Sequence, residues 1–162
     1  RLGEALALKF NDVKTDFLNI TKSISRIQKN GEYIITSPKT HSSIRHVKLD
    51  NATIEILNKL RIYYQDFVNF NDDWFIFGGI RPKARTSIER YKNKYCKIAG
   101  VKQIKIHDFR HSHASLLLSK NTPIPVISKR LGHKNTDVTL KVYSHLIPED
   151  EDKAVTMLNN LV

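Results

Sequence analysis

Two histidines and an arginine precede a tyrosine in the last third of the chain, at spacings that could serve phosphodiester chemistry. His107 and Arg110 form a His-x-x-Arg pair, and Tyr143 follows His133 by ten residues. A tyrosine is a weak nucleophile at neutral pH, because its phenol has a pKa of about 10. The histidines and the arginine that precede it therefore indicate a phosphate diester, which the tyrosine would attack and hold as a covalent ester.

Cleaving a DNA strand without a metal requires three kinds of group. Guanidinium groups suit the growing negative charge of the phosphate, because they stay charged and bind oxygens in pairs. A nucleophile must attack in line, and an acid must protonate the departing 5′ oxygen. The chain offers this set, including a lysine in a Ser-Pro-Lys-Thr turn, as Arg1, Lys39, His107, Arg110, His133 and Tyr143.

The charge of the chain points to nucleic acid. Its 162 residues hold 27 Lys and Arg against 16 Asp and Glu, a net charge of +11. Four acids are consecutive at 149–152, so residues 1–148 have 26 basic and 12 acidic side chains, a net of +14. Such an imbalance is typical of nucleic-acid binding. A basic surface that only aids solubility, or a ribosome-associated role, is the plainer alternative.

Length and hydropathy fit one globular domain with a real core, since 40% of the residues are apolar. No membrane-length apolar run or signal peptide is visible. The single Cys96 excludes an internal disulfide, which fits a reducing cytoplasm.

The elements that must position these residues follow from periodicity and turn signals. Helices are expected at 2–9, about 52–66, 86–99, 107–120, 125–131 and 136–144, with a last one after Pro148. The helix at 86–99 should turn Ile88, Tyr91, Tyr95 and Ile98 inward. Short β-like runs lie between Asn11 and Leu49. We therefore expect an α+β fold, mostly helical, with a small antiparallel three-stranded sheet near the N-terminus.

Five motifs in order resemble the catalytic domain of the tyrosine recombinases, the phage and integrative-element integrase family. They are Arg1-x-Gly3-Glu4, the turn Lys39, His107-x-x-Arg110-His111, Leu131-Gly132-His133 and Tyr143. The segments around the last three are especially close to integrases of Gram-positive phages and conjugative elements.

The resemblance implies a role for each residue. Tyr143 would form a 3′-phosphotyrosyl link and leave a free 5′ hydroxyl. Arg1 and Arg110 would clamp the non-bridging oxygens, and Lys39 would protonate the leaving oxygen. His107 would assist proton transfer, as a base toward Tyr143, and His133 would hydrogen-bond the phosphate. No metal, cofactor or ATP is implied.

The resemblance also implies partners and organisation. Residues 1–162 would be one catalytic domain without the family's N-terminal core-binding domain, and 148–162 a tail helix that docks in trans. Double-stranded attachment-site DNA would be the partner in a bacterial or phage-infected cytoplasm, with a tetramer on DNA and a monomer in its absence. The residues expected to contact DNA are Arg45, Lys48, Arg81, Lys83, Arg85 and Lys134.

Three other interpretations stay open. A type IB topoisomerase shares the chemistry, and the last helices could form a non-catalytic helix-turn-helix module. A metal cluster of His107, His111, His113 and His133 is disfavoured, because no cysteine accompanies them and His111 and His113 cannot share a helix face. His111 is expected to be a packed or hydrogen-bonded supporting residue, and Glu4 to orient a basic neighbour or to cap its helix.

Overall fold

The fold is mostly helical, with two small sheets in its N-terminal third. The computed structural model describes residues 1–27, 32–37, 41–146, 155–156 and 158–160. The helices are α1 (Leu2–Ala7), α2 (Asn51–Gln65), α3 (Arg85–Ile98), α4 (Asp108–Ser119), α5 (Ile124–Leu131) and α6 (Thr136–Tyr143). The strands are β1 (Phe17–Ile20), β2 (Ser23–Ile27), β3 (Tyr33–Thr36) and β4 (Arg45–Lys48). The short 3-10 turns are Phe10–Asp12, His41–Ser43 and Ser144–Leu146.

The strands form two antiparallel pairs, so the expected three-stranded sheet is wrong. β1 pairs with β4, with Phe17 opposite Lys48, and β2 pairs with β3, with Ser23 opposite Thr36. Alternation along the chain locates strands, but their partners depend on the tertiary fold, and an irregularity after Ile24 interrupts the second ladder. The β1–β4 pair matters for function because β4 packs against α5.

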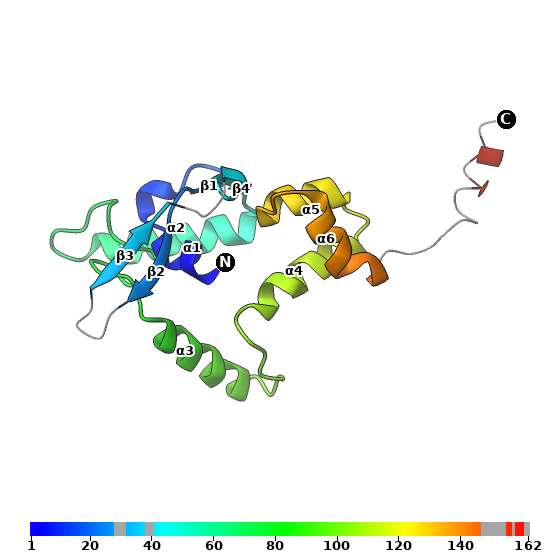
Figure 1. The fold of residues 1–162 in the computed structure, drawn as a ribbon. Coiled ribbons are helices and arrows are strands. Elements are labelled where there is room, and N and C mark those ends of the chain that lie inside the picture. The colour runs from blue at the N-terminus through cyan, green and yellow to red at the C-terminus, as the bar shows by residue number, and fades with distance from the viewer. Residues whose placement is uncertain (28–31, 38–40, 147–154, 157, 161–162) are drawn as a thin grey trace.

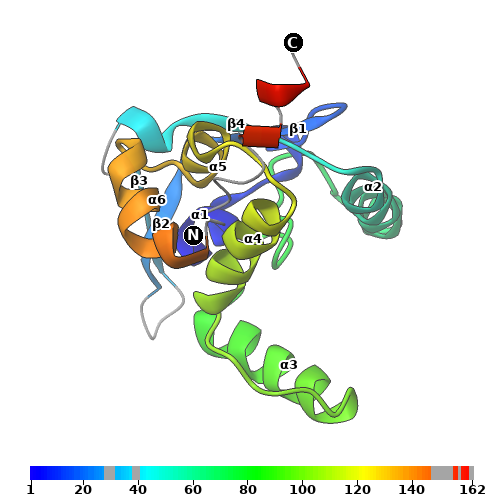
Figure 2. The same ribbon diagram turned by 90° about the vertical axis from the view of Figure 1, so that its right-hand side faces the viewer.

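The core is divided between the two ends of the chain. Ala114, Leu118, Ile127, Leu131 and Tyr143 form one buried cluster among α4, α5 and α6. Two further clusters, around Leu6 with Phe75 and around Phe10 with Ile76, bury α1 and the sheets. Figures 1 and 2 show the N-terminus in the middle of the molecule, between the sheets and α4. The first residue therefore lies where the two ends of the chain meet.

Helix α3 does not bury the face that its periodicity predicted. Ile88 packs partly against a core cluster, but Tyr91, Tyr95 and Ile98 are exposed. Both views show α3 extending away from the rest of the molecule. Lys83 and Arg90 instead lie at cation–π distances of 5.7 and 5.6 Å from the exposed Tyr91 ring. Periodicity marks an apolar face, but it does not say whether another element covers that face.

The other helices match their predicted positions to within a few residues. Asp50 caps α2 by accepting a hydrogen bond from the Thr53 amide, and Pro125 lies in the first turn of α5. Of the tail helix predicted after Pro148, residues 148–154, 157 and 161–162 lie outside the described residues, and residues 155–156 and 158–159 are helical. None of the described helices is both long and apolar enough to cross a membrane.

Candidate active site

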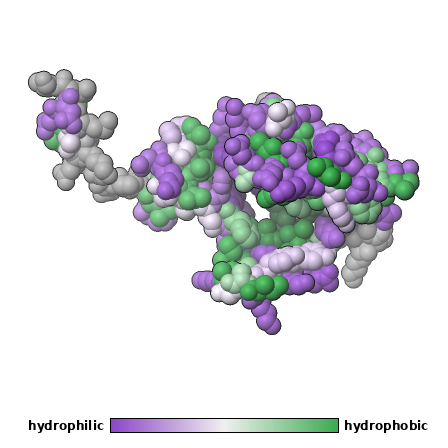
Figure 3. All heavy atoms as spheres, turned by 180° about the vertical axis from the view of Figure 1, so that it is seen from behind, coloured by the Kyte–Doolittle hydropathy of each residue, from purple (hydrophilic) through white to green (hydrophobic). Residues whose placement is uncertain are grey.

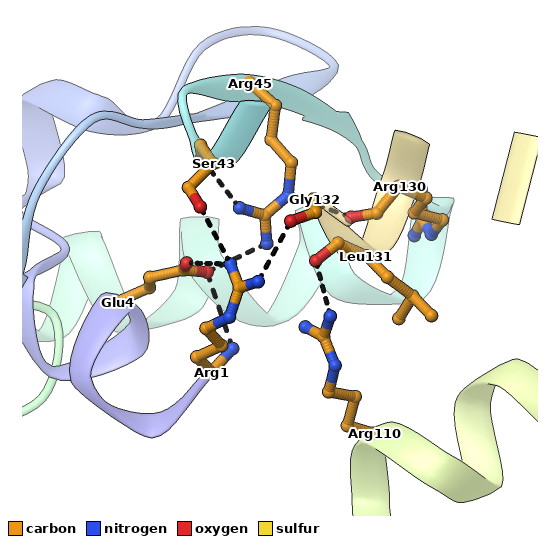
Figure 4. A network of polar contacts seen from close by, with 8 residues as sticks. All are labelled: Arg1, Glu4, Ser43, Arg45, Arg110, Arg130, Leu131 and Gly132. Carbon is orange, nitrogen blue, oxygen red and sulfur yellow. Dashed lines mark hydrogen bonds and ion pairs between the residues drawn. The ribbon is translucent and has the colours of Figure 1, made fainter. Parts of the chain in front are cut away.

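Three consecutive carbonyls at the end of α5 each accept a hydrogen bond from a different arginine (Figure 4). The Arg130 carbonyl accepts from Arg45 Nε at 2.9 Å, and the Leu131 carbonyl from Arg110 Nη2 at 2.7 Å. The Gly132 carbonyl accepts from Arg1 Nη2 at 2.9 Å. The last carbonyls of a helix have no partner within it and carry its negative dipole end. The end of α5 therefore gathers guanidinium groups from α4, β4 and the start of the chain.

Gly132 makes this arrangement possible. It ends α5 in the left-handed conformation, with φ 68° and ψ 42°, and so turns the chain sharply into His133, as its sequence position predicted. A Cβ at this position would lie 2.9 Å from Nη1 of Arg45 and 3.1 Å from its Cζ. Glycine is therefore needed both for its backbone conformation and for the space beside Arg45.

Replacing Gly132 with alanine should destabilise the domain and displace Arg45. The left-handed conformation costs an L-residue about 1–2 kcal/mol, and the contact with Arg45 adds to it. Gly100→Ala is the matched control, because Gly100 also has a positive φ of 65° but nothing lies within 4 Å of its Cβ position. Chemical denaturation of both variants should show the larger loss for Gly132→Ala, and equal losses would contradict the role given to Arg45.

Glu4 joins two of the arginines. It is only 4% exposed, and its two carboxylate oxygens each accept from a different guanidinium at 2.8 Å, Oε1 from Arg1 and Oε2 from Arg45. Ser43 adds a second link, because its Oγ accepts from Arg1 at 3.2 Å and its carbonyl accepts from Arg45 at 2.9 Å. The prediction that Glu4 orients a basic neighbour is confirmed.

The electrostatics leave a surplus of positive charge. Burial acts to raise the pKa of Glu4, but its hydrogen bonds to Arg45 and Arg1 outweigh this and lower the pKa to about 2. Burial, followed by the charges of Arg1 and Arg45, lowers the pKa of Arg110. Three arginines thus surround one carboxylate. Within the described residues, Nε and Nη1 of Arg110 have no protein acceptor, so they are available to an anion.

His133 follows Gly132 and faces the same charges. Its Nδ1 lies 2.8 Å from the hydroxyl of Thr139, on α6. Burial, followed by Arg110, Arg1 and Arg45, lowers the pKa of His133 to about 4. The imidazole is therefore neutral at pH 7, so it can bind a phosphate oxygen only as a hydrogen-bond donor.

Acidification should lower the stability of the fold through His133. Its folded pKa of about 4 lies below the value of about 6.5 in an unfolded chain. As the pH falls, the unfolded state takes up the proton first, so the stability is complete above pH ~6.5 and is lost between ~6.5 and ~4. Because the ring is partly exposed, solvent screening reduces the loss to about 1–2 kcal/mol.

Denaturation at several pH values checks this prediction. Burial also lowers the pKa of His107 and His113, so both act in the same direction, and only a variant isolates the share of His133. His133→Gln should flatten the pH dependence above about pH 5.5, because Glu4 contributes its own loss of stability only as the pH approaches its unfolded pKa of about 4.3. The exposed His145 provides the control variant His145→Gln, and equal slopes for the two variants would contradict the prediction.

Tyr143 is buried and its hydroxyl contacts a histidine. The residue is 4% exposed within the α4–α6 cluster, and its hydroxyl lies 2.8 Å from Nδ1 of His111. Burial raises the pKa of Tyr143, against the smaller opposing effect of Arg110. The tyrosine is therefore near the arginines but needs a proton acceptor, and His111 is in contact with it.

His107 lies beside His111 instead of touching Tyr143. The two rings are edge-to-face with centroids 5.0 Å apart. His107 is the exposed residue that precedes α4, and its carbonyl accepts from the amide of Arg110 at 3.0 Å. The contact that the sequence assigned to His107 as a base for Tyr143 is thus made by His111.

A cavity of about 850 Å³ opens beside the arginines. Arg1, His107 and Arg110 lie on its wall together with apolar residues of α1, β1, β4 and α4. Residues Arg85 and Glu89 of α3 form its far side. Figure 3, seen from behind, shows a hollow between α3 and the rest of the molecule, with hydrophobic residues along its walls. The arginines therefore face open space large enough for an extended substrate.

The predicted DNA contacts have different positions. Arg45 is not on the surface: its side chain is 9% exposed, and Glu4, Ser43 and the Arg130 carbonyl occupy its guanidinium. Arg45 lines the cavity but its guanidinium already has three protein partners, so it supports the site, and its contact with DNA stays a prediction. The other five are exposed, namely Lys48, Arg81, Lys83, Arg85 and Lys134. Lys39 lies outside the described residues.

The structure brings together Arg1, Arg110 and His133. Tyr143 lies at the end of α6, and His107 directly precedes α4. Sequence reasoning did not assign Thr139 or Ser43. Thr139 lies four residues before Tyr143, so the two share one helix face, and this spacing was the available signal. No comparable signal marked Ser43.

Comparison with known proteins supports the same assignment. Residues 1–150 match the profile of the Phage integrase family. The ICEBs1 integrase of Bacillus subtilis (strain 168) is 32% identical over 168 residues, which cover 100% of this chain and 46% of that protein. The XerC-like tyrosine recombinase of Caldanaerobacter subterraneus subsp. tengcongensis is 31% identical over 183 residues. The match covers 99% of this chain and 46% of that protein. The chain thus spans about half the length of these curated relatives.

A solved structure shows the same fold. The Tn1549 transposon integrase in complex with transposon right end DNA superposes with a TM-score of 0.73 at 20% identity. The match covers 99% of this chain and 54% of that one.

Proposed function

Because the chain belongs to the phage integrase family, we propose that it is the catalytic domain of a site-specific tyrosine recombinase. It cuts and rejoins DNA strands to integrate or excise a mobile element. The observation that carries this proposal is the convergence of Arg1, Arg110 and His133 on one helix end, close to a buried Tyr143. Such a group suits a phosphodiester transition state that is held by charge and attacked by a phenol.

The proposed reaction exchanges one ester for another. The Tyr143 oxygen forms a bond to phosphorus, and the bond from phosphorus to the 5′ oxygen breaks. Arg110 and Arg1 hold the non-bridging oxygens while the negative charge grows. Lys39 gives a proton to the leaving 5′ oxygen. In the second step the 5′ hydroxyl of another strand attacks the phosphotyrosine, so rejoining needs neither ATP nor a metal.

His111 is proposed as the acceptor of the Tyr143 proton. The 2.8 Å contact to Nδ1 is within the range for direct proton transfer, and the raised pKa of Tyr143 makes an acceptor necessary. His107, beside His111, is proposed to assist proton transfer at the phosphate instead of acting directly on the tyrosine.

Double-stranded DNA is the proposed partner. The Tn1549 integrase structure was determined with transposon DNA, and this chain has a net charge of +11. Lys48, Arg81, Lys83, Arg85 and Lys134 are exposed and are proposed to contact the phosphate backbone, which positions DNA without reading its sequence. The setting would be a bacterial cytoplasm.

The proposed assembly is a tetramer on DNA and a monomer in its absence, with segment 148–162 docked on a neighbouring copy. Sedimentation of the full-length protein on its site, with and without residues 149–162, tests this assembly. Deletion should reduce DNA-bound oligomers, and unchanged oligomers would refute the tail exchange.

A nicked suicide substrate tests the function itself. Full-length protein incubated with its attachment site should give an SDS-resistant adduct on the 3′ phosphate, and peptide mapping should place it on Tyr143. Absence of any adduct would favour a non-catalytic DNA-binding module. Relaxation of supercoiled DNA without strand exchange would favour a type IB topoisomerase.

A further inference from the structure

We infer that Thr139 is a positioning residue that fixes His133 as the neutral tautomer with its proton on Nε2. In that form the imidazole donates a hydrogen bond to the phosphate. The inference rests on the proposed function for the identity of the phosphate, but the tautomer itself is a property of the protein without DNA.

The contact is buried and specific. Thr139 is 0% exposed, and its hydroxyl lies 2.8 Å from Nδ1 of His133. Among the described residues, His133 is the only hydrogen-bond partner of this hydroxyl. A helical threonine usually has an alternative, because its hydroxyl can donate to the carbonyl four residues earlier. Here that carbonyl belongs to Asn135, and it accepts instead from the Ser128 hydroxyl at 3.1 Å.

The direction of the hydrogen bond follows from this environment. A hydroxyl carries one proton to donate, and a buried donor without an acceptor costs about 1–3 kcal/mol. If Nδ1 of His133 carried the ring proton, the Thr139 hydroxyl would accept from it and its own proton would have no partner. If Nδ1 is unprotonated, the Thr139 hydroxyl donates to it and both groups are satisfied. The second arrangement is therefore favoured.

The consequence for the phosphate depends on the charge of His133. Burial, followed by the charges of Arg110, Arg1 and Arg45, lowers the pKa of His133 to about 4 and so keeps the ring neutral at pH 7. A neutral imidazole has one N–H, and when Nδ1 accepts, that N–H is on Nε2. The opposite tautomer would present a lone pair at Nε2 and repel a phosphate oxygen. Thr139 thus decides whether a neutral His133 binds the phosphate.

The same helix face carries the nucleophile. Thr139 and Tyr143 are four residues apart on α6, so their side chains project on the same side. Both hydroxyls contact Nδ1 of a histidine, His133 in one case and His111 in the other. The helix that supplies the attacking oxygen therefore also sets the tautomer of the phosphate donor.

Nitrogen-15 NMR of the imidazole groups in the full-length protein tests the tautomer directly. His133→Gln assigns the His133 signals. At pH 7 the wild type should show a protonated Nε2 and an unprotonated Nδ1. Thr139→Val, which replaces the hydroxyl by a methyl group, should shift the signals toward a mixture, and Thr139→Ser should restore them. A protonated Nδ1 in the wild type, or unchanged signals in Thr139→Val, would overturn the inference.

Adduct formation gives the second measurement. Thr139→Val should slow it by about 10-fold to 100-fold, which is less than the loss for removing a whole transition-state donor, and Thr139→Ser should stay within about 3-fold. Thr136→Val, on the same helix but without contact to His133, is the control and should match the wild type. If Thr139→Val does not fold, the wild-type and Thr139→Ser spectra still show which ring nitrogen of His133 is protonated. A wild type that forms no adduct but shows protonated Nε2 refutes the proposed function and leaves the tautomer standing.

Discussion

Tyr143→Phe is expected to abolish the covalent adduct and to leave DNA binding intact. The substitution removes the oxygen that would bond to phosphorus, and the buried hydroxyl one turn earlier on α6, that of Thr139, is engaged by His133. The arginines at the end of α5 do not depend on the tyrosine, since their acceptors are Leu131 and Gly132. Gel electrophoresis in SDS measures the adduct, and a mobility shift measures binding.

The stability of this variant should change little. Phenylalanine keeps the ring in the α4–α6 cluster, and only the hydrogen bond to His111 is lost, at a cost of about 1 kcal/mol. Tyr95→Phe is the matched control, because Tyr95 is 62% exposed and has no proposed role in the reaction. An adduct that persists in Tyr143→Phe, or that disappears in Tyr95→Phe, would remove Tyr143 as the nucleophile.

Glu4→Ala is expected to be strongly destabilising, by about 3–5 kcal/mol. Removing one partner of a buried ion pair leaves the other charge without compensation, and here Arg45, at 9% side-chain exposure, would be left among Arg1 and Arg110. A domain of this size has about 5–15 kcal/mol in total, so the midpoint of thermal unfolding should fall by about 10 °C or more. Circular dichroism during heating measures it.

Two further variants test whether the loss comes from the buried charge of Glu4. Glu4→Gln keeps the volume and one acceptor oxygen, so its loss should lie between the wild type and Glu4→Ala. Glu55→Ala breaks the ion pair of Glu55 with Lys59, whose side chains are 66% and 73% exposed, and should change the free energy of unfolding by less than about 1 kcal/mol. If Glu4→Ala unfolds no earlier than Glu55→Ala, the carboxylate does not hold the arginines.

Phosphodiester chemistry could be predicted from the sequence because few other functions require histidines, arginines and a tyrosine at these spacings. Gly132 could be placed at a helix end, and the structure confirms it. The strand pairing was wrong because alternation does not name a partner. The inward face of α3 was wrong beyond Ile88, because no element among the described residues buries Tyr91, Tyr95 or Ile98. Lys39 stays a prediction, since it lies outside the described residues.

The supporting contacts were harder to predict, because they depend on tertiary packing. Arg45 was expected only to contact DNA, and the fold places Glu4 and the Arg130 carbonyl around it. His111 was expected to be a supporting residue, and its partner became known only when α4 and α6 were packed together.

The three neighbouring carbonyls at the end of α5 would make the proposed DNA cleavage depend on complete folding. Their arginines come from residue 1, from β4 and from α4, so a chain with any of these segments undocked has no phosphate site. Newly synthesised or damaged copies would therefore be harmless to the DNA that they encounter. Loss of adduct formation and loss of tertiary structure should coincide along a denaturant titration, because the proposed strand cleavage requires the folded site.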